Sequence, residues 1–133
     1  MASTIQSYTD LLVWQKAFDL GLAIYRVTSR FPDTERYGLV SQLRRGGVSI
    51  ESDIAEGYGR QSTLDYIRFL RMARGALYEL QTQLLFAERL DYLPGEQSSE
   101  LLEQSDECGR MLAGLIRSLE QKRSTHRSHH THH

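Results

Sequence analysis

The chain has 133 residues, of which 40% are hydrophobic and 25% are charged. This composition fits a single globular domain and excludes a chain too polar to form a core. No apolar run approaches the roughly 18 residues of a membrane span. The N-terminus MASTIQSYTD lacks the basic and apolar regions of a secretory signal. We therefore expect a cytoplasmic protein. The single cysteine, Cys108, cannot form an internal disulfide, which agrees with a reducing compartment.

The formal net charge of −1 conceals an uneven distribution. Nine Arg face six acidic residues in the stretch 26–74, a local balance of +3. Three Arg face nine acidic residues in the stretch 75–120, a local balance of −6. A basic segment of this kind favours binding to a polyanion, whereas the plainer alternative is an ordinary solvated helical surface.

Apolar residues recur at helical spacing through most of the chain, and they predict helices at about 10–30, 34–57, 62–91 and 96–121. In the first helix the expected buried stripe runs through Leu11, Trp14, Phe18, Gly21 or Leu22, and Tyr25, with Thr9 or Asp10 at its start. In the second, Leu39, Leu43, Ile50 and Ile54 form the stripe, and Gly46 and Gly47 indicate a place where another backbone comes close.

The third and fourth helices have equally regular stripes. Ser62 and Asp65 resemble a capping box at the start of the third helix. The expected core residues are Ile67, Leu70, Ala73, Leu77, Leu80, Leu84 and Ala87 in the third helix, and Leu101, Leu102, Ser105, Cys108, Leu112, Leu115, Ile116 and Leu119 in the fourth.

Four such helices joined by short turns predict an all-α fold, an antiparallel up-down-up-down bundle that occupies residues 1–121. The remaining residues, 122–133, form a polar His-rich tail that we expect to be disordered. All five histidines lie in this tail, where imidazoles bind transition metals without a fixed geometry.

The sequence contains no catalytic constellation. The predicted folded part has no histidine, no Glu-x-x-His pair and no phosphate-binding Gly-Lys-Ser/Thr loop. We interpret Glu51, Asp53 and Glu56 as surface charges or partners of nearby Arg. We therefore expect a protein that is not an enzyme, with no cofactor, no metal site and no small-molecule substrate.

Arginines are the residues best suited to a binding function, because their planar guanidinium groups match phosphates. The candidate nucleic-acid-binding residues are Arg44, Arg45, Arg60, Arg68 and Arg71. Arg68, Arg71 and Arg74 follow at three-residue steps and so fan across their helix, and some of them are expected to pair with acidic neighbours. A nearly neutral subunit binds polyanions weakly, but several copies of one basic patch act multivalently.

Three stretches of the chain, within residues 11–93, carry a family resemblance: LLVWQKAFDL, FPDTERYGLVSQLRRGGVSIESDIAEGYGR and DYIRFLRMARGALYELQTQLLFAERLDYL. They resemble the bacterial four-helix bundle proteins encoded by intervening sequences of large-subunit ribosomal RNA genes. That family is similar in fold to the accessory variability determinant of diversity-generating retroelements. The resemblance implies a left-handed antiparallel bundle, a ring-shaped homopentamer and a genetic link to nucleic acid.

This chain departs from the family pattern at several positions. Gly46 and Gly47 stand where the family has alanine or another small residue, Glu51 where proline is frequent, and Asp53 where Asn is usual. Asp53 adds a negative charge near Arg60 and so weakens phosphate binding there.

Two functional hypotheses follow. The first is a non-enzymatic, homo-oligomeric adaptor whose basic surface contacts structured RNA or DNA. The alternative is a protein–protein interaction scaffold with no nucleic-acid role.

Overall fold

The computed structural model describes residues 4–131, with side chains described for residues 4–125. All regular structure in this range is helical. The elements are a 3-10 turn at Tyr8–Asp10, α1 at Leu12–Thr28, a 3-10 turn at Asp33–Glu35, α2 at Leu39–Tyr58, α3 at Thr63–Arg89 and α4 at Gly95–Thr131. Within the same range, no helix has the length and apolar character needed to cross a membrane.

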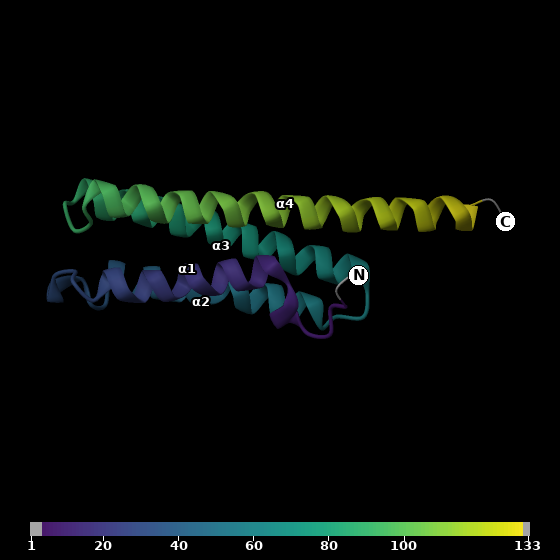
Figure 1. Cartoon of the computed structure of the whole chain (residues 1–133), viewed down its shortest axis with the longest axis horizontal. Coiled ribbons are helices and arrows are strands. Elements are labelled where there is room, and N and C mark those ends of the chain that lie inside the picture. Colours follow the sequence, from purple (N-terminus) through teal and green to yellow (C-terminus); the bar gives the residue numbers. More distant parts are fainter. Residues whose placement is uncertain (1–3, 132–133) are drawn as a thin grey trace.

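The four helices surround one hydrophobic core (Figure 1). Each helix packs against the next in the chain, and α4 also contacts α1. The predicted stripes of α3 and α4 are confirmed, because Leu77, Leu80, Leu84, Cys108 and Leu112 are completely buried. In α2 the predicted residues Leu43, Ile50 and Ile54 are completely buried as well.

In α1 the predicted stripe is confirmed at Gly21, which is buried, and at Leu11 and Trp14, which pack partly buried against the core, but it is wrong at Phe18 and Tyr25. The buried residues are Val13, Ala17, Leu20, Gly21, Ile24 and Thr28. Phe18 and Tyr25 are instead 41% and 45% exposed, and Trp14 is half-buried and stacked on Phe18 with ring centroids 5.0 Å apart. Because α1 is apolar on two faces, helical spacing alone does not distinguish the face that meets the core.

Two helix boundaries also differ from the prediction. Ser7 and Asp10 form a capping box that closes a 3-10 turn, so α1 begins at Leu12 rather than at Thr9 or Asp10. The helix expected to end near residue 121 continues as α4 to Thr131, through most of the tail predicted to be disordered. The segment after Gly114 contains no Gly or Pro to end a helix. Residues 132–133 and the five histidine side chains lie outside the described part.

The predicted close approach of two backbones is confirmed at Gly47, where α2 crosses α1. A Cβ atom on Gly21 of α1 would lie 2.5 Å from the carbonyl oxygen of Gly47. A Cβ atom on Gly47 would in turn lie 3.3 Å from the Cα of Gly21. Gly46 faces α3 instead, where a Cβ would meet the side chain of Leu80 at an ordinary 3.4 Å.

The substitution Gly21→Ala tests this crossing. Alanine favours a helix by up to about 1 kcal/mol over glycine, but here its methyl group overlaps the Gly47 carbonyl of the facing backbone. We expect a net loss of about 1 to 3 kcal/mol in the free energy of unfolding, measured by urea titration.

Gly75→Ala is the matched control, because Gly75 lies inside α3 and a Cβ there meets no atom within 4 Å. This control is expected to raise the free energy of unfolding by somewhat less than about 1 kcal/mol. Equal effects of the two substitutions would contradict the close crossing.

Candidate nucleic-acid interface

The turn between α2 and α3 brings three of the predicted arginines to one end of the molecule. α2 ends at Tyr58, and the side chain of Ser62 accepts a hydrogen bond from the backbone N–H of Asp65 at 3.0 Å, which caps α3. A Cβ atom on Gly57 would lie 2.8 Å from the Cβ of Phe69. The last turn of α2 therefore packs closely on α3 and holds the turn against it.

Arg60 and Arg68 are both held on the same aromatic ring. The guanidinium carbon of each lies 4.7 Å from the ring centroid of Phe69, whose residue is 8% exposed. Each cation–π contact of this kind contributes on the order of 1 kcal/mol to stability, and it restricts the position of the guanidinium group. Phe69 was not among the predicted site residues, because side chains adjacent in a helix point in different directions and the sequence gives no sign of this contact.

Each of these arginines also has an acidic partner. Arg60 Nη2 donates to Glu56 Oε1 at 3.0 Å, and Arg68 Nη2 lies 3.4 Å from Asp65 Oδ1. The side chains of Arg60 and Arg68 remain 41% and 57% exposed. An exposed ion pair contributes about 0 to 1 kcal/mol, so a phosphate can compete for either arginine.

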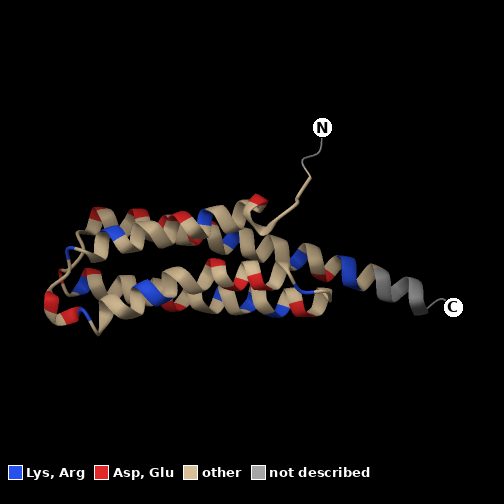
Figure 2. Ribbon diagram, turned by 90° about the horizontal axis from the view of Figure 1, so that it is seen from below, with Lys and Arg blue, Asp and Glu red and all other residues tan. Residues whose placement is uncertain are grey.

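Arg71 joins α3 to α4. Its Nη2 atom donates to Glu120 Oε2 at 2.6 Å, and both side chains are about half exposed. The predicted pairing of some arginines with acids of neighbouring helices is confirmed here. We call Arg60, Arg68 and Arg71 the turn arginines. Basic and acidic residues are both spread over the helices of the bundle (Figure 2).

Arg44 lies at the other end of α2 and makes mainly intramolecular contacts. Its Nε donates to Thr28 Oγ1 at 2.9 Å, and its Nη2 donates to the carbonyl oxygen of Tyr25 at 3.3 Å. The guanidinium carbon also lies 4.6 Å from the Tyr25 ring centroid. Arg44 thus supplies hydrogen-bond donors to the carboxyl-terminal turn of α1.

The five predicted arginines therefore do not form one surface. Sixteen positions separate Arg44 from Arg60, which corresponds to about 24 Å along a helix. Arg45 is exposed beside Arg44 and belongs to that distant group. The structure brings together only the three turn arginines.

Glu51 is the largest departure from the predicted surface charges. Its residue is 8% exposed, and its Oε1 atom has no hydrogen-bond partner among the described residues. Burial raises the pKa of this carboxyl from 4.5 to about 8. The glycine crossing explains the burial, because the position of a Gly21 Cβ lies only 2.8 Å from Glu51 Oε2. The interpretation of Glu51 as a surface charge is wrong.

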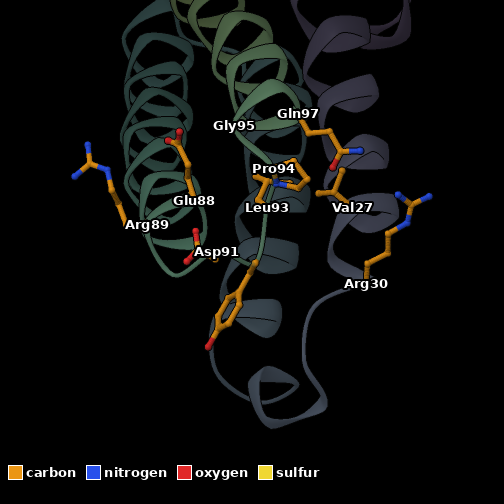
Figure 3. A pocket seen from close by; sticks show the side chains of 10 residues that line it. Val27, Arg30, Glu88, Arg89, Asp91, Leu93, Pro94, Gly95 and Gln97 are labelled. Atoms are coloured by element: carbon orange, nitrogen blue, oxygen red, sulfur yellow. The ribbon is translucent and has the colours of Figure 1, made fainter.

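A pocket lies at the end opposite the turn arginines, where α1 ends and α3 connects to α4 (Figure 3). Its volume is about 660 Å³. Acidic and basic side chains both line the pocket, and Arg30 and Arg89 lie on opposite sides of it (Figure 3). Its polar groups therefore do not converge on one ligand atom. Among the described residues, no three His, Cys, Asp or Glu side chains gather as metal ligands.

Comparison with known proteins agrees with this helical architecture. Residues 9–114 match the model of the 23S rRNA-intervening sequence protein family. The chain belongs to this family. The resemblance stated from the sequence motifs is thereby confirmed.

A solved structure has the same fold as this member of the intervening sequence protein family. It is a crystal structure, at 1.70 Å resolution, of a protein with unknown function from the S23 ribosomal protein family of Bacteroides thetaiotaomicron. The two share 25% sequence identity with a TM-score of 0.72, over 79% of this chain and 98% of the other. No match is found among the curated proteins.

The buried carboxyl of Glu51 predicts a pH-dependent stability. The folded protein keeps a proton on Glu51 up to about pH 8, whereas the unfolded chain releases it near 4.5. The free energy of unfolding is therefore highest at low pH. It falls by about 1.4 kcal/mol per pH unit as the pH rises between these two pKa values. Burial also raises the pKa of the neighbouring Cys108 thiol to about 11, so this thiol stays neutral there.

Urea unfolding between about pH 5 and pH 8 measures this slope. The substitution Glu51→Gln is expected to flatten it, because glutamine has no proton to lose. Glu103→Gln, at an exposed position of α4, is the control and leaves the slope unchanged. An unchanged slope in the Glu51→Gln protein would contradict the assignment of a buried, protonated carboxyl.

Proposed function

We propose that this protein is a non-enzymatic, homo-oligomeric adaptor that contacts structured RNA or DNA through the turn arginines. The observation that carries the proposal is the pair formed by Arg60 and Arg68, both held on Phe69 with their side chains partly exposed. Arginines fixed on a ring lose less conformational freedom on binding a phosphate. Arg45 and its neighbour Arg44 form a second basic site on α2, which lies far from the turn arginines.

The family name supports ribosomal RNA as the class of nucleic acid, because the family is named for sequences that intervene in 23S rRNA. An adaptor of this kind works in the cytoplasm. It needs no cofactor, because it holds RNA or DNA without changing it.

We also propose that the chain assembles with copies of itself as a ring of five. Two surfaces of α1 and α3 support this, because they expose large apolar side chains that the described chain covers only in part. These side chains are Leu12, Phe18, Leu22 and Tyr25 on α1, and Leu64, Met72, Tyr78, Leu85, Phe86 and Leu90 on α3. α1 and α3 do not contact each other, so the two surfaces lie apart and suit head-to-tail contacts, which form a ring when the rotation between subunits closes.

Within each subunit we propose an antiparallel, left-handed bundle. The antiparallel direction is supported by contacts between α3 and α4, in which residues further along α3 meet residues earlier in α4. Arg71 pairs with Glu120, Gln81 donates to Ser105 at 2.9 Å, and Ser98 donates to Glu88 at 3.4 Å. A ring of such subunits presents several copies of the turn arginines, which raises the affinity for one polyanion.

The alternative function is a protein–protein interaction scaffold without a nucleic-acid role. The exposed aromatic side chains of α1 favour it, because Phe18 and Tyr25 are residue types typical of protein interfaces. A scaffold of this kind does not require the turn arginines for binding its partner, and this difference separates the two hypotheses.

Binding of a fluorescently labelled fragment of 23S rRNA tests the proposal. The double substitution Arg60→Gln and Arg68→Gln removes two phosphate-binding groups. We expect weaker binding and a salt dependence whose slope falls by about 2, measured by fluorescence anisotropy across a salt series.

The control for this experiment carries Arg26→Gln and Arg30→Gln at the opposite end of the molecule. It changes the net charge equally and is expected to bind the fragment like the unmodified protein. Equal losses in both variants would show that only overall charge matters. No binding by the unmodified protein at low salt would favour the scaffold.

The substitution Phe18→Glu tests self-association through α1. A charge placed on the exposed α1 surface is costly to bury in an interface, so we expect a smaller particle in light scattering coupled to size-exclusion chromatography. Gln104→Glu, at an exposed site on α4, adds the same charge and should leave the particle size unchanged. An unaltered size in the Phe18→Glu protein would remove α1 from the interface.

A further inference from the structure

The turn between α2 and α3 gathers aromatic rings as well as arginines. Tyr58 and Tyr66 form an edge-to-face pair with ring centroids 6.2 Å apart, one at the end of α2 and the other in the first turn of α3. Phe69 lies one turn further along α3, against Gly57 and beneath both Arg60 and Arg68. Together these five side chains, Tyr58, Arg60, Tyr66, Arg68 and Phe69, make up what we call the aromatic–arginine cluster.

The charges of this cluster are balanced. Arg60 is paired with Glu56 and Arg68 with Asp65, so the two ion pairs carry no net charge. Binding to duplex phosphates depends on a surplus of positive charge, because it is driven by the release of counterions. A neutral cluster is therefore poorly suited to follow a duplex backbone.

Flat groups remain accessible in the cluster. Tyr58 and Tyr66 are half-buried, and the Arg60 and Arg68 side chains are 41% and 57% exposed. Unpaired bases stack on aromatic rings and on guanidinium planes, and this stacking requires no net charge.

We infer that the aromatic–arginine cluster binds unpaired nucleotides, such as those in a single-stranded loop of a structured RNA, by stacking their bases in addition to the phosphate contacts of Arg60 and Arg68. The inference rests on the proposed function and narrows it to a class of nucleic acid. Bases of a continuous duplex are stacked on one another and do not present their faces to the cluster. Unpaired bases do present their faces, and a cluster of this size accommodates one or two such bases.

The test compares a labelled oligouridine of about 12 nucleotides with an RNA duplex of equal length, at about 50 mM salt. Both probes are titrated with the full-length protein. The unmodified protein is expected to bind oligouridine more tightly than the duplex.

The double substitution Arg60→Lys and Arg68→Lys keeps both charges but removes the planar groups. We expect an approximately tenfold loss of oligouridine affinity, as for one lost stacking contact, with an unchanged salt slope and unchanged duplex binding. The matched control, Arg26→Lys and Arg30→Lys, leaves oligouridine binding unchanged.

A second variant, Tyr58→Leu, removes a ring without altering charge and is expected to weaken oligouridine binding as well. Thermal unfolding of each variant confirms that the fold is intact.

The outcomes separate this inference from the proposed function. If the lysine and leucine variants bind oligouridine like the unmodified protein, stacking is excluded while binding through charge stands. Equal affinity of the unmodified protein for duplex and oligouridine also overturns the inference and leaves the adaptor hypothesis intact. If the unmodified protein binds neither probe nor the 23S rRNA fragment, both proposals fail.

Discussion

The contact between Gly21 of α1 and Gly47 of α2 is the constraint on which the arrangement of these two helices depends. No side chain fits there, because a Cβ on Gly21 would lie 2.5 Å from the facing carbonyl oxygen. The close crossing places one face of α1 on the core and turns Phe18 and Tyr25 outward. It also covers Glu51, whose Oε1 atom is buried without a hydrogen-bond partner in the described part of the chain. One backbone contact thus shapes both the exposed apolar surface and the buried acid.

Much of the fold follows from sequence periodicity, but α1 shows its limit. In α2, α3 and α4 the residues predicted to be buried are largely the buried ones, although α3 also exposes large apolar side chains away from the core. α1 has two apolar faces, and its spacing fits either of them. The distinguishing signal was the small residue Ala17 together with Gly21, which permits close packing. Larger side chains on the other face are available for a partner.

The candidate site was predictable in its residue types but not in its geometry. Arginine content and position indicated a basic segment, yet Glu120, the partner of Arg71, lies 49 residues away in sequence. Arg44 was separated from the turn arginines by its role at the end of α1. Charges that are paired within the chain weaken a purely electrostatic surface. The aromatic rings beside them give that surface a second way to bind nucleic acid.

Photochemical crosslinking of RNA to the unmodified protein tests the central claim most directly, because it reports the contacted residues themselves. An RNA that carries 4-thiouridine is bound, irradiated and digested, and the crosslinked peptides are identified by mass spectrometry. The account predicts crosslinks within residues 56–71, at Tyr58, Tyr66 or their neighbours. Crosslinks confined to α1 or to the pocket at the opposite end, or none at low salt, would contradict it.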